Sequence, residues 1–399
     1  MVVSARGAQT RREILDAAVA LVSERGYGRT SVREIARTAG VSQAGLLHHF
    51  GSKEAVFLEV LRRRDDLEGA RGRAVRKLTD AVGSNAGEPG AVRLYVVLSA
   101  ESTTSPGAGR FFRERFRRLR EALREDPDCA GGRLTPDSVA MLLIAAADGL
   151  QVQWLLDPSV AMRRRLELLQ AILAGAATPP SPAGRSRSRL GSTGTPASDA
   201  LRDYDRGMAT RGPYAKGVAK REEILDVALR LFAQKGYDRT SVREIARETG
   251  LSQAGLLHHF ATKEDLFLEV LRRRDERDGD PAGGRHVHSV DALISAVANN
   301  ASEPGLVRLF VLMSAEAAEE GSRGGAWFAD RYRWLLEQIA DDVRRHQATG
   351  AVDPDLDPAD VASLLVAVAD GLQLQWLLDP EGVDMAQRLE QLWRLLRRD

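Results

Sequence analysis

The nine residues SQAGLLHHF occur twice in this chain, at residues 42–50 and again at residues 252–260. The duplication extends outward from them at a constant offset, since 252 − 42 = 210. It holds without a gap over residues 14–64 and 224–274. A repeat of this length decides the architecture before any other feature, because each copy must form the same structural unit.

The copies diverge beyond residue 64 but can still be aligned. DGLQVQWLLDP at residues 148–158 returns as DGLQLQWLLDP at residues 370–380. Between the copies, residues 176–217 are rich in Pro, Gly, Ser and Arg, and such a stretch cannot bury enough apolar surface to offset the entropy of ordering it. We expect a flexible linker there, which spans roughly 35 Å and lets the two copies dock side by side.

The composition indicates an all-α protein with more than one domain. A chain of 399 residues is too long for a single hydrophobic core. Apolar residues recur at spacings of three and four rather than two, which is typical of helices. With 57 Lys and Arg against 56 Asp and Glu, the net charge is close to zero, so any binding of nucleic acid must depend on local basic clusters.

The sequence lacks the usual features of secreted, membrane and catalytic proteins. The single cysteine, Cys129, cannot form an internal disulfide and favours a reducing compartment. The first ten residues contain no apolar leader, and no stretch approaches the roughly 18 to 20 consecutive apolar residues that span a bilayer. We therefore expect a cytoplasmic protein without a membrane partner. No catalytic triad, phosphate-binding glycine loop or pair of catalytic carboxylates occurs at a meaningful spacing, so neither an enzyme nor a cofactor is predicted.

The first third of each copy predicts three helices. An amphipathic helix over residues 12–25 ends at Gly26. Thr30 and Ser31 are good N-cap residues for a second helix. A turn of sequence Gly-Val-Ser leads into a third helix over residues 43–49. Two short helices joined by a glycine-containing turn form a helix-turn-helix, whose second helix reads the major groove of DNA.

The order of residues in this region resembles the DNA-binding domain of the TetR family of bacterial regulators. The shared features are an apolar helix, Gly-Tyr, Thr, Val-Arg-Glu-Ile-Ala, Gly-Val-Ser, a recognition helix that ends in His-Phe, and then Lys-Glu. In the first copy they occur at residues 26–27, 30, 32–36, 40–42, 49–50 and 53–54. The second copy repeats them with Leu251 in place of Val. The family usually has a Tyr in the recognition helix where this chain has Leu47 and Leu257, so the contact normally made by that hydroxyl is not expected here.

Several residues are suited to binding DNA phosphates. Thr30, Ser31 and the free N–H groups of the second helix form an anion-binding end, and Arg33 projects from the same end. Lys53, at the start of the fourth helix, is placed for another phosphate. The alternative is that Thr30 is only a cap and Lys53 only a solvated charge.

The start of the recognition helix is suited to reading bases. Gln43 can pair bidentately with adenine, and Ala44 or Gly45 lets the backbone approach thymine methyl groups. The residues expected to hold this helix on the core are Leu46, Leu47 and a buried Phe50. The complete set of expected DNA-binding residues is Thr30, Ser31, Arg33, Ser42, Gln43, Ala44, Gly45, His48, His49, Lys53, Thr240, Ser241, Arg243, Ser252, Gln253, Ala254, Gly255, His258, His259 and Lys263.

The remainder of each copy predicts a helical domain. In the first copy, helices are expected over residues 73–83, 89–102, 109–125, 136–156 and 160–173. The DGLQ segments resemble the ligand-binding and dimerisation domain of actinobacterial TetR regulators, whose last two helices form a four-helix bundle with those of a partner. The expected dimerisation residues are Gly149, Val152, Leu156, Gly371, Leu374 and Leu378. Their small and apolar side chains would let helices approach closely, although the stripe could instead pack inside its own domain.

The predicted fold is thus all-α, with two tandem TetR-like units packed as a pseudo-dimer. Helix-turn-helix domains are expected over residues 1–60 and 218–272, helical ligand-binding and dimerisation domains over residues 61–175 and 273–399, and the linker over residues 176–217. No metal is predicted, because adjacent helical residues such as His48 and His49 point about 100° apart and cannot chelate one ion.

The resemblance implies a sequence-specific transcriptional regulator, and we expect a repressor that a small apolar effector releases from palindromic double-stranded DNA. A single chain carries both half-site readers, so a monomer would suffice. Two alternatives stay open: pairing of copies between chains, and a ligand-sequestering or protein-interaction module that has lost DNA binding. FFRERFRRLR at residues 111–120 is far more basic than WFADRYRWLL at residues 327–336, so we expect unequal ligand affinities in the two halves.

Overall fold

The computed structural model describes residues 5–64, 73–130, 132–175, 213–235, 240–277, 287–317 and 323–398. Helices form almost all of the regular structure in these ranges, where only an isolated bridge between Val352 and Arg397 has strand character. The predicted all-α class is therefore confirmed. The chain forms two compact units, Met1–Pro179 together with Leu271–Asp399, and Pro180–Val270.

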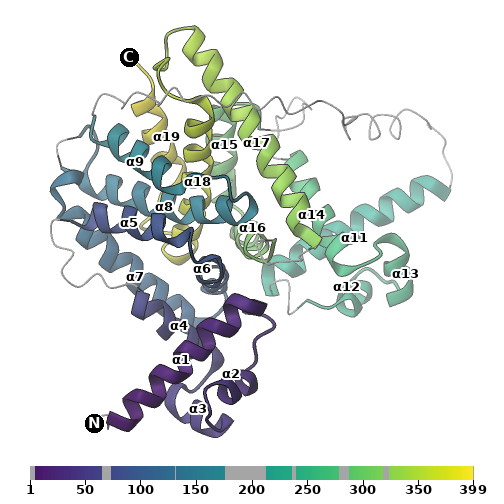
Figure 1. Ribbon diagram of the computed structural model, residues 1–399. Coiled ribbons are helices and arrows are strands. Elements are labelled where there is room, and N and C mark those ends of the chain that lie inside the picture. Colours follow the sequence, from purple (N-terminus) through teal and green to yellow (C-terminus); the bar gives the residue numbers. More distant parts are fainter. Residues whose placement is uncertain are drawn as a thin grey trace. The chain divides into compact units, whose positions relative to one another are not determined.

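The first helix-turn-helix domain consists of α1 (Ala5–Arg25), α2 (Val32–Thr38), α3 (Gln43–Phe50) and α4 (Lys53–Arg64) (Figure 1). The helix α1 begins earlier than predicted but ends at the predicted place. It ends there because Gly26 adopts a φ of +80°, a left-handed conformation that favours glycine. The apolar face predicted for α1 is buried, with Ile14 fully inaccessible and Leu15 only 2% exposed.

The second helix-turn-helix domain consists of α11 (Pro213–Lys235), α12 (Val242–Glu248), α13 (Gln253–His259) and α14 (Lys263–Arg277). The helix α11 begins inside the segment predicted to be linker, so its first residues are helical. The rest of that predicted linker, residues 176–212, lies outside the described residues.

The two helical domains repeat the same order of helices. The first contains α5 (Ala74–Asn85), α6 (Pro89–Glu101), α7 (Pro106–Arg124), the short 3₁₀ helix η1 (Pro127–Cys129), α8 (Pro136–Leu156) and α9 (Met162–Leu173). The second contains α15 (Val290–Asn300), α16 (Pro304–Ala317), α17 (Arg323–Ala348), α18 (Pro358–Leu378) and α19 (Met385–Leu396). In the first domain each of these α-helices begins and ends within three residues of its predicted bounds.

The helices α8 and α18 lie side by side at the centre of their unit (Figure 1) and are buried along most of their length. They approach closely at two glycines. A Cβ atom at Gly149 would overlap the carbonyl oxygen of Ala367, and one at Gly371 would overlap the carbonyl oxygen of Ala145. The small-residue stripe therefore faces the other copy's helix at these glycines, and not only its own domain.

Both central helices are long and apolar enough to meet a membrane-span criterion of length and mean hydropathy. The expectation from the sequence used a stricter criterion, roughly 18 to 20 consecutive apolar residues, which neither helix meets. Polar residues such as Asp148 and Gln151 interrupt the apolar runs, but they do not bring the average below the threshold. The most apolar windows of α8 and α18 are 83% and 89% buried inside the protein, as in core helices, so they are weak evidence for a membrane.

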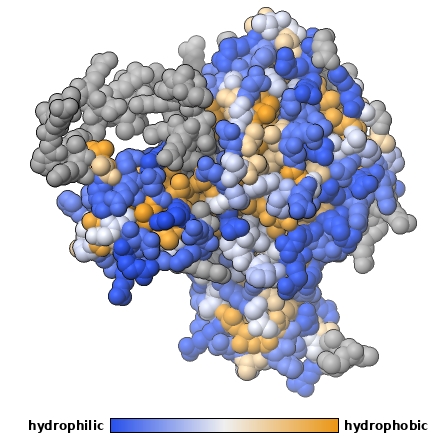
Figure 2. All heavy atoms as spheres, turned by 180° about the vertical axis from the view of Figure 1, so that it is seen from behind, coloured by the Kyte–Doolittle hydropathy of each residue, from blue (hydrophilic) through white to orange (hydrophobic). Residues whose placement is uncertain are grey.

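Hydrophilic side chains cover much of the face seen in Figure 2, and hydrophobic ones gather in smaller areas between them. Val19 and Val218 are the large apolar side chains classed as exposed among the described residues. Large apolar side chains are therefore mostly buried, and the central helices α8 and α18 contribute much of the hydrophobic core.

Candidate DNA-reading surface and effector cavities

The recognition helices α3 and α13 present the same side chains to solvent. The Ser42 hydroxyl caps α3 by accepting a hydrogen bond from the Gly45 N–H at 3.0 Å, and Ser252 caps α13 through the Gly255 N–H at 3.0 Å. Leu46 and Leu256 are fully buried and anchor the two helices. The exposed side chains are Ser42, Gln43, Ala44 and His48 in α3, and Ser252, Gln253, Ala254 and His258 in α13.

An arginine on the first helix of each domain fixes the far end of the recognition helix. Arg11 donates to the backbone oxygen of His49 at 2.8 Å and lies 4.3 Å above the ring of Phe50. Arg221 makes the same contacts with His259, at 3.0 Å, and with Phe260, at 4.3 Å. Neither arginine is among the predicted site residues, although their separation, 221 − 11 = 210, is that of the repeat.

The predicted burial of the phenylalanine after the paired histidines is wrong for the first copy. Phe50 is half-buried, whereas Phe260 is only 3% exposed. The backbone explains the difference. Phe50 is the last residue of α3, while Phe260 follows α13 in an extended conformation that turns its ring into the core. Leu47, predicted to be a core residue, is half-buried, as is its counterpart Leu257.

The end of α2 that was expected to bind a phosphate already holds a carboxylate. The backbone N–H of Ser31 donates to Glu34 at 3.0 Å, and Ser31 caps the helix in return at 3.2 Å. The hydrogen bond from the Ser31 side chain lowers the pKa of Glu34, and Arg25 lies 3.1 Å from this carboxylate. Thr30 is 2% exposed and donates its hydroxyl hydrogen to the Gly26 carbonyl at 2.8 Å.

The second copy also caps α12 with a serine, but its threonine has a different acceptor. Thr240 is fully buried, and its hydroxyl donates to the Leu231 carbonyl at 3.3 Å. Ser241 caps the Glu244 N–H at 3.1 Å. Both threonines thus face inward, whereas Arg33 and Arg243 are exposed at these helix ends, as are the capping residues Ser31 and Ser241.

Residues at the start of α4 tie the first reading domain to its helical domain. The Lys53 ammonium donates to the Tyr27 carbonyl at 2.6 Å and lies 4.1 Å above the Tyr27 ring. The carboxylate of Glu54 accepts hydrogen bonds from the Ser105 hydroxyl and the Ala108 N–H, both at 2.6 Å. Lys53 is therefore not merely a solvated charge, and its counterpart Lys263 is also half-buried.

The phenol of Tyr27 is part of the same connection. Burial raises its pKa well above the usual range, and Glu101 at the end of α6 adds to the shift through its charge and a hydrogen bond. A movement of α6 or α7 would therefore change the contacts at the base of the first helix-turn-helix domain.

Each helical domain contains a cavity, and the two cavities occupy equivalent places. The first has a volume of about 130 Å³ and the second about 60 Å³. Their corresponding lining residues include Leu78 and Leu293, Asn85 and Asn300, Arg115 and Arg331, Asp148 and Asp370, and Gln151 and Gln373. None of these is among the predicted site residues, because their helices come together only in the folded domain.

A tyrosine hydroxyl binds the aspartate of each cavity, but from a different helix. In the first half, Tyr95 on α6 donates to Asp148 at 2.8 Å and accepts from Arg115 at 3.0 Å. In the second half, Tyr332 on α17 donates to Asp370 at 2.6 Å, and burial together with that carboxylate raises its pKa. The positions are exchanged between the copies: the counterpart of Tyr95 is Phe310, and the counterpart of Tyr332 is Phe116.

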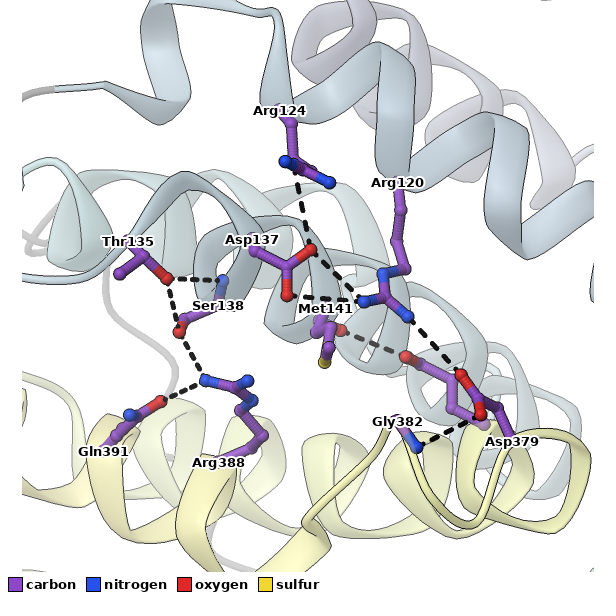
Figure 3. Close-up of polar contacts among 11 residues, drawn as sticks. Arg120, Arg124, Thr135, Asp137, Ser138, Met141, Asp379, Gly382, Arg388 and Gln391 are labelled. Atoms are coloured by element: carbon purple, nitrogen blue, oxygen red, sulfur yellow. Dashed lines mark hydrogen bonds and ion pairs between the residues drawn. The ribbon is translucent and has the colours of Figure 1, made fainter.

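Polar contacts join the two halves beside the central helices. Figure 3 shows Arg120 of α7 between Asp137, at 3.2 Å, and Asp379 of the second half, at 3.9 Å. Arg388 of α19 donates to the hydroxyl of Ser138 in the same view.

Further polar contacts cross from α8 and α9 to α18. Gln153 donates to the Ser363 carbonyl at 3.1 Å and accepts from the Ser363 hydroxyl at 2.6 Å. Asp360 lies 2.8 Å from Arg164 and 3.2 Å from Arg165, with its own side chain only 9% exposed. The expected dimerisation residues Gly149, Val152, Gly371 and Leu374 line one small space between the halves. Leu156 is half-buried and Leu378 is buried.

The described residues contain no group of three or more His, Cys, Asp and Glu side chains that could hold a metal ion. The ring centroids of His48 and His49 lie 5.9 Å apart, and those of His258 and His259 lie 6.0 Å apart.

Two helix-turn-helix domains, each with a cavity-containing helical domain, define a DNA-binding transcriptional regulator. The family model for bacterial regulatory proteins of the tetR family matches residues 14–60 and again 224–270. The model for the C-terminal domain of BetI-type transcriptional repressors matches residues 70–177 and 289–398. The chain therefore belongs to the TetR family and contains two tandem TetR-like units.

Curated relatives are regulators of the same kind. The HTH-type transcriptional repressor Rv1474c of Mycobacterium tuberculosis is 32% identical over 160 residues, which cover 39% of this chain and 80% of that protein. The HTH-type transcriptional regulator UidR of Escherichia coli K12 is 27% identical over 42% of this chain and 84% of that protein. Among solved structures, NalD, the secondary repressor of the MexAB-OprM multidrug efflux pump in Pseudomonas aeruginosa, is 25% identical, with coverage of 45% of this chain and 98% of that chain and a TM-score of 0.36.

Proposed function

We propose that this chain is a sequence-specific repressor that carries both half-site readers and leaves its operator when a small ligand occupies a helical-domain cavity. The observation that carries the proposal is the identity of the exposed faces of α3 and α13. Two recognition helices with the same exposed residues match an inverted repeat, because each half of such a site presents the same bases to one helix. The proposal includes the four domains and the linker, with the boundaries predicted from the sequence.

The base-reading role falls to the exposed residues at the start of each recognition helix. Gln43 and Gln253 have side chains long enough to reach a base edge, and each amide offers adenine both a donor and an acceptor. Arg33 and Arg243 are exposed and would contact phosphate, with Lys53 and Lys263 at the edge. The inward-facing Thr30 and Thr240 would support α2 and α12 through their backbone contacts, with Ser31 and Ser241 as caps.

Selection of random DNA on the intact protein is expected to yield an inverted repeat, because the two readers are identical. Replacing Gln43 with alanine should relax base preference in one half-site and cost about 1 to 3 kcal/mol there, if the amide makes a bidentate pair. Gln253→Ala should do the same in the other half-site. Two unrelated half-sites would contradict the proposal, and no enrichment would favour a module that has lost DNA binding.

Pairing of the two halves within one chain is also part of the proposal. Support comes from the close approach at Gly149 and Gly371 and from the buried contact between Gln153 and Ser363. In this arrangement no second chain is needed to cover α8 and α18.

We expect light scattering at micromolar concentration to give the mass of one chain, 43.5 kDa. The physical reason is that the surfaces which pair TetR-like halves are already buried against each other. An obligate dimer would show instead that copies pair between chains, as in a four-headed assembly.

For a ligand in the first cavity, release is proposed to act through α4. Arg64, near the end of this helix, lines the first cavity and bonds Glu88 at 2.6 Å and Asn85 at 3.2 Å. A ligand that changes the spacing of α4 and α5 would change the orientation of the reading domain, which shifts the equilibrium away from the DNA-bound state.

A regulator of this kind works in the cytoplasm, which is the reducing compartment that its composition favours. Cys129 is 2% exposed, and burial raises its pKa to about 12, so the thiol is inert there rather than a nucleophile.

A further inference from the structure

The side-chain amide of Gln151, at the wall of the first cavity, forms hydrogen bonds within the protein. Gln151 accepts a hydrogen bond from the Asn85 side chain at 3.2 Å and donates to the Ala147 carbonyl at 3.0 Å. The carboxylate beside it is bound by Tyr95, which is held in turn by Arg115. A ligand that uses the Gln151 amide would have to break these internal hydrogen bonds first.

The second cavity presents an acceptor that the protein leaves open. Gln373 corresponds to Gln151 and is 5% exposed, yet its side-chain oxygen accepts no hydrogen bond from any described residue. An amide oxygen buried without a donor is costly, because it has lost its contact with water and gained no partner. A ligand that supplies a donor would remove that cost, so this oxygen marks a binding point.

A carboxylate lies one turn away on the same helix. Asp370 and Gln373 are spaced i and i+3 on α18, so they lie on one face, and both line the cavity. Asp370 already accepts a hydrogen bond from Tyr332, and a carboxylate has room for further donors. The polar part of the second cavity wall therefore offers two hydrogen-bond acceptors, the charged carboxylate of Asp370 and the neutral amide oxygen of Gln373.

The rest of the second cavity is apolar and aromatic. Phe310, Leu293 and Trp334 line it, and Trp334 stands where the first copy has Arg118. The guanidinium of Arg331 also faces this cavity and lies 5.0 Å from the centre of the Phe310 ring. The first cavity is lined by two arginines, Arg64 and Arg115, so the second is the less positive of the two.

We propose that the second cavity is an effector site and that it takes a small primary amine with an apolar body. The ammonium would donate to Gln373 and Asp370, and the body would lie against the aromatic wall. A protonated amine has three donors and its pKa lies well above 7, so it can serve both acceptors at once. A carboxylate ligand would instead set its own acceptors against two acceptors of the protein.

This inference rests on the proposed function only in calling the ligand an effector, since binding itself can be measured without DNA. The volume of about 60 Å³ admits a ligand of few heavy atoms. We choose 3-methylbutylamine as the probe, with 3-methylbutanol and 4-methylpentanoate as neutral and anionic partners of the same branched skeleton.

Calorimetry on the full chain is expected to show one saturable site for the amine and at least tenfold weaker binding of the alcohol and the acid. Gln373→Leu should weaken amine binding roughly tenfold or more, because a ligand donor loses its acceptor. Gln151→Leu is the matched variant in the first half and should leave amine binding as it is in the parent. Asp370→Asn should weaken the amine more than the alcohol, because only the amine carries a charge.

Four results would overturn the assignment: preferred binding of the acid, no saturable binding of the amine, equal losses in the two glutamine variants, or two equivalent sites per chain. A folded Gln373→Leu variant, checked by circular dichroism, keeps the comparison valid. Operator binding without any ligand is scored separately. A chain that binds DNA but not the amine refutes the effector site alone, and a chain that binds the amine but no DNA refutes the repressor alone.

Discussion

Gly149→Ala and Gly371→Ala are each expected to lower the free energy of unfolding of the helical domains by about 3 kcal/mol or more. A methyl group at either position would overlap a backbone carbonyl of the facing helix, Ala367 or Ala145. Backbone cannot rotate out of the way as a side chain can, so α8 and α18 would have to move apart. That movement would weaken the buried contacts around both glycines.

The chain offers a clean readout and a matched control. All five tryptophans lie in the helical domains, so their fluorescence in a urea titration reports on those domains and not on the readers. Gly217→Ala makes the same chemical change within α11, where a Cβ would meet no atom within 4 Å. It should leave the tryptophan transition where it is in the parent. Gly149→Ala with an unchanged transition would mean that the two halves do not pack through these glycines.

Helix ends were the most predictable part of the fold, because they depend on residues that are adjacent in sequence. The helix α8 begins and ends at the predicted residues: the Thr135 hydroxyl caps it, accepting from Ser138 N–H at 3.2 Å, and a proline occupies its first turn. Gly26 likewise ends α1 through its own backbone conformation. Local chemistry alone was sufficient at these positions.

Side-chain roles were less predictable, because they depend on partners far away in sequence. The expected phosphate contact Thr30 turned out to face inward, and Lys53 to bind a carbonyl contributed by Tyr27, 26 residues earlier. The cavities follow the same rule. Tyr95 meets Asp148 across 53 residues, and no local pattern signals that pairing.

The repeat carried information that a single copy would not. Comparison of the copies shows where they have exchanged residues, as with Tyr95 and Phe310 on the one hand and Phe116 and Tyr332 on the other. In each half a tyrosine still reaches the aspartate of the cavity. The readers have kept their exposed residues while the cavities have changed, which is consistent with one operator motif and two chemically different cavities.

Ala44→Glu and Ala254→Glu are each expected to weaken operator binding about 100-fold or more, and the double variant should bind only at the non-specific level. Both alanines are exposed near the start of a recognition helix, where a carboxylate would meet the negative field of the DNA. The fold should not suffer, because an acidic residue in the first turn of a helix interacts favourably with the helix dipole.

The measurement is a fluorescence-anisotropy titration of a symmetric operator at fixed salt. Ala20→Glu serves as the control, since it adds the same charge at an exposed position of α1, outside the proposed reading surface. Because α3 and α13 expose the same residues, the two single variants should lose affinity equally on a symmetric site. If only one of them weakens binding, a single reader contacts the operator. The second copy would then contribute to the fold and the cavities, but not to recognition.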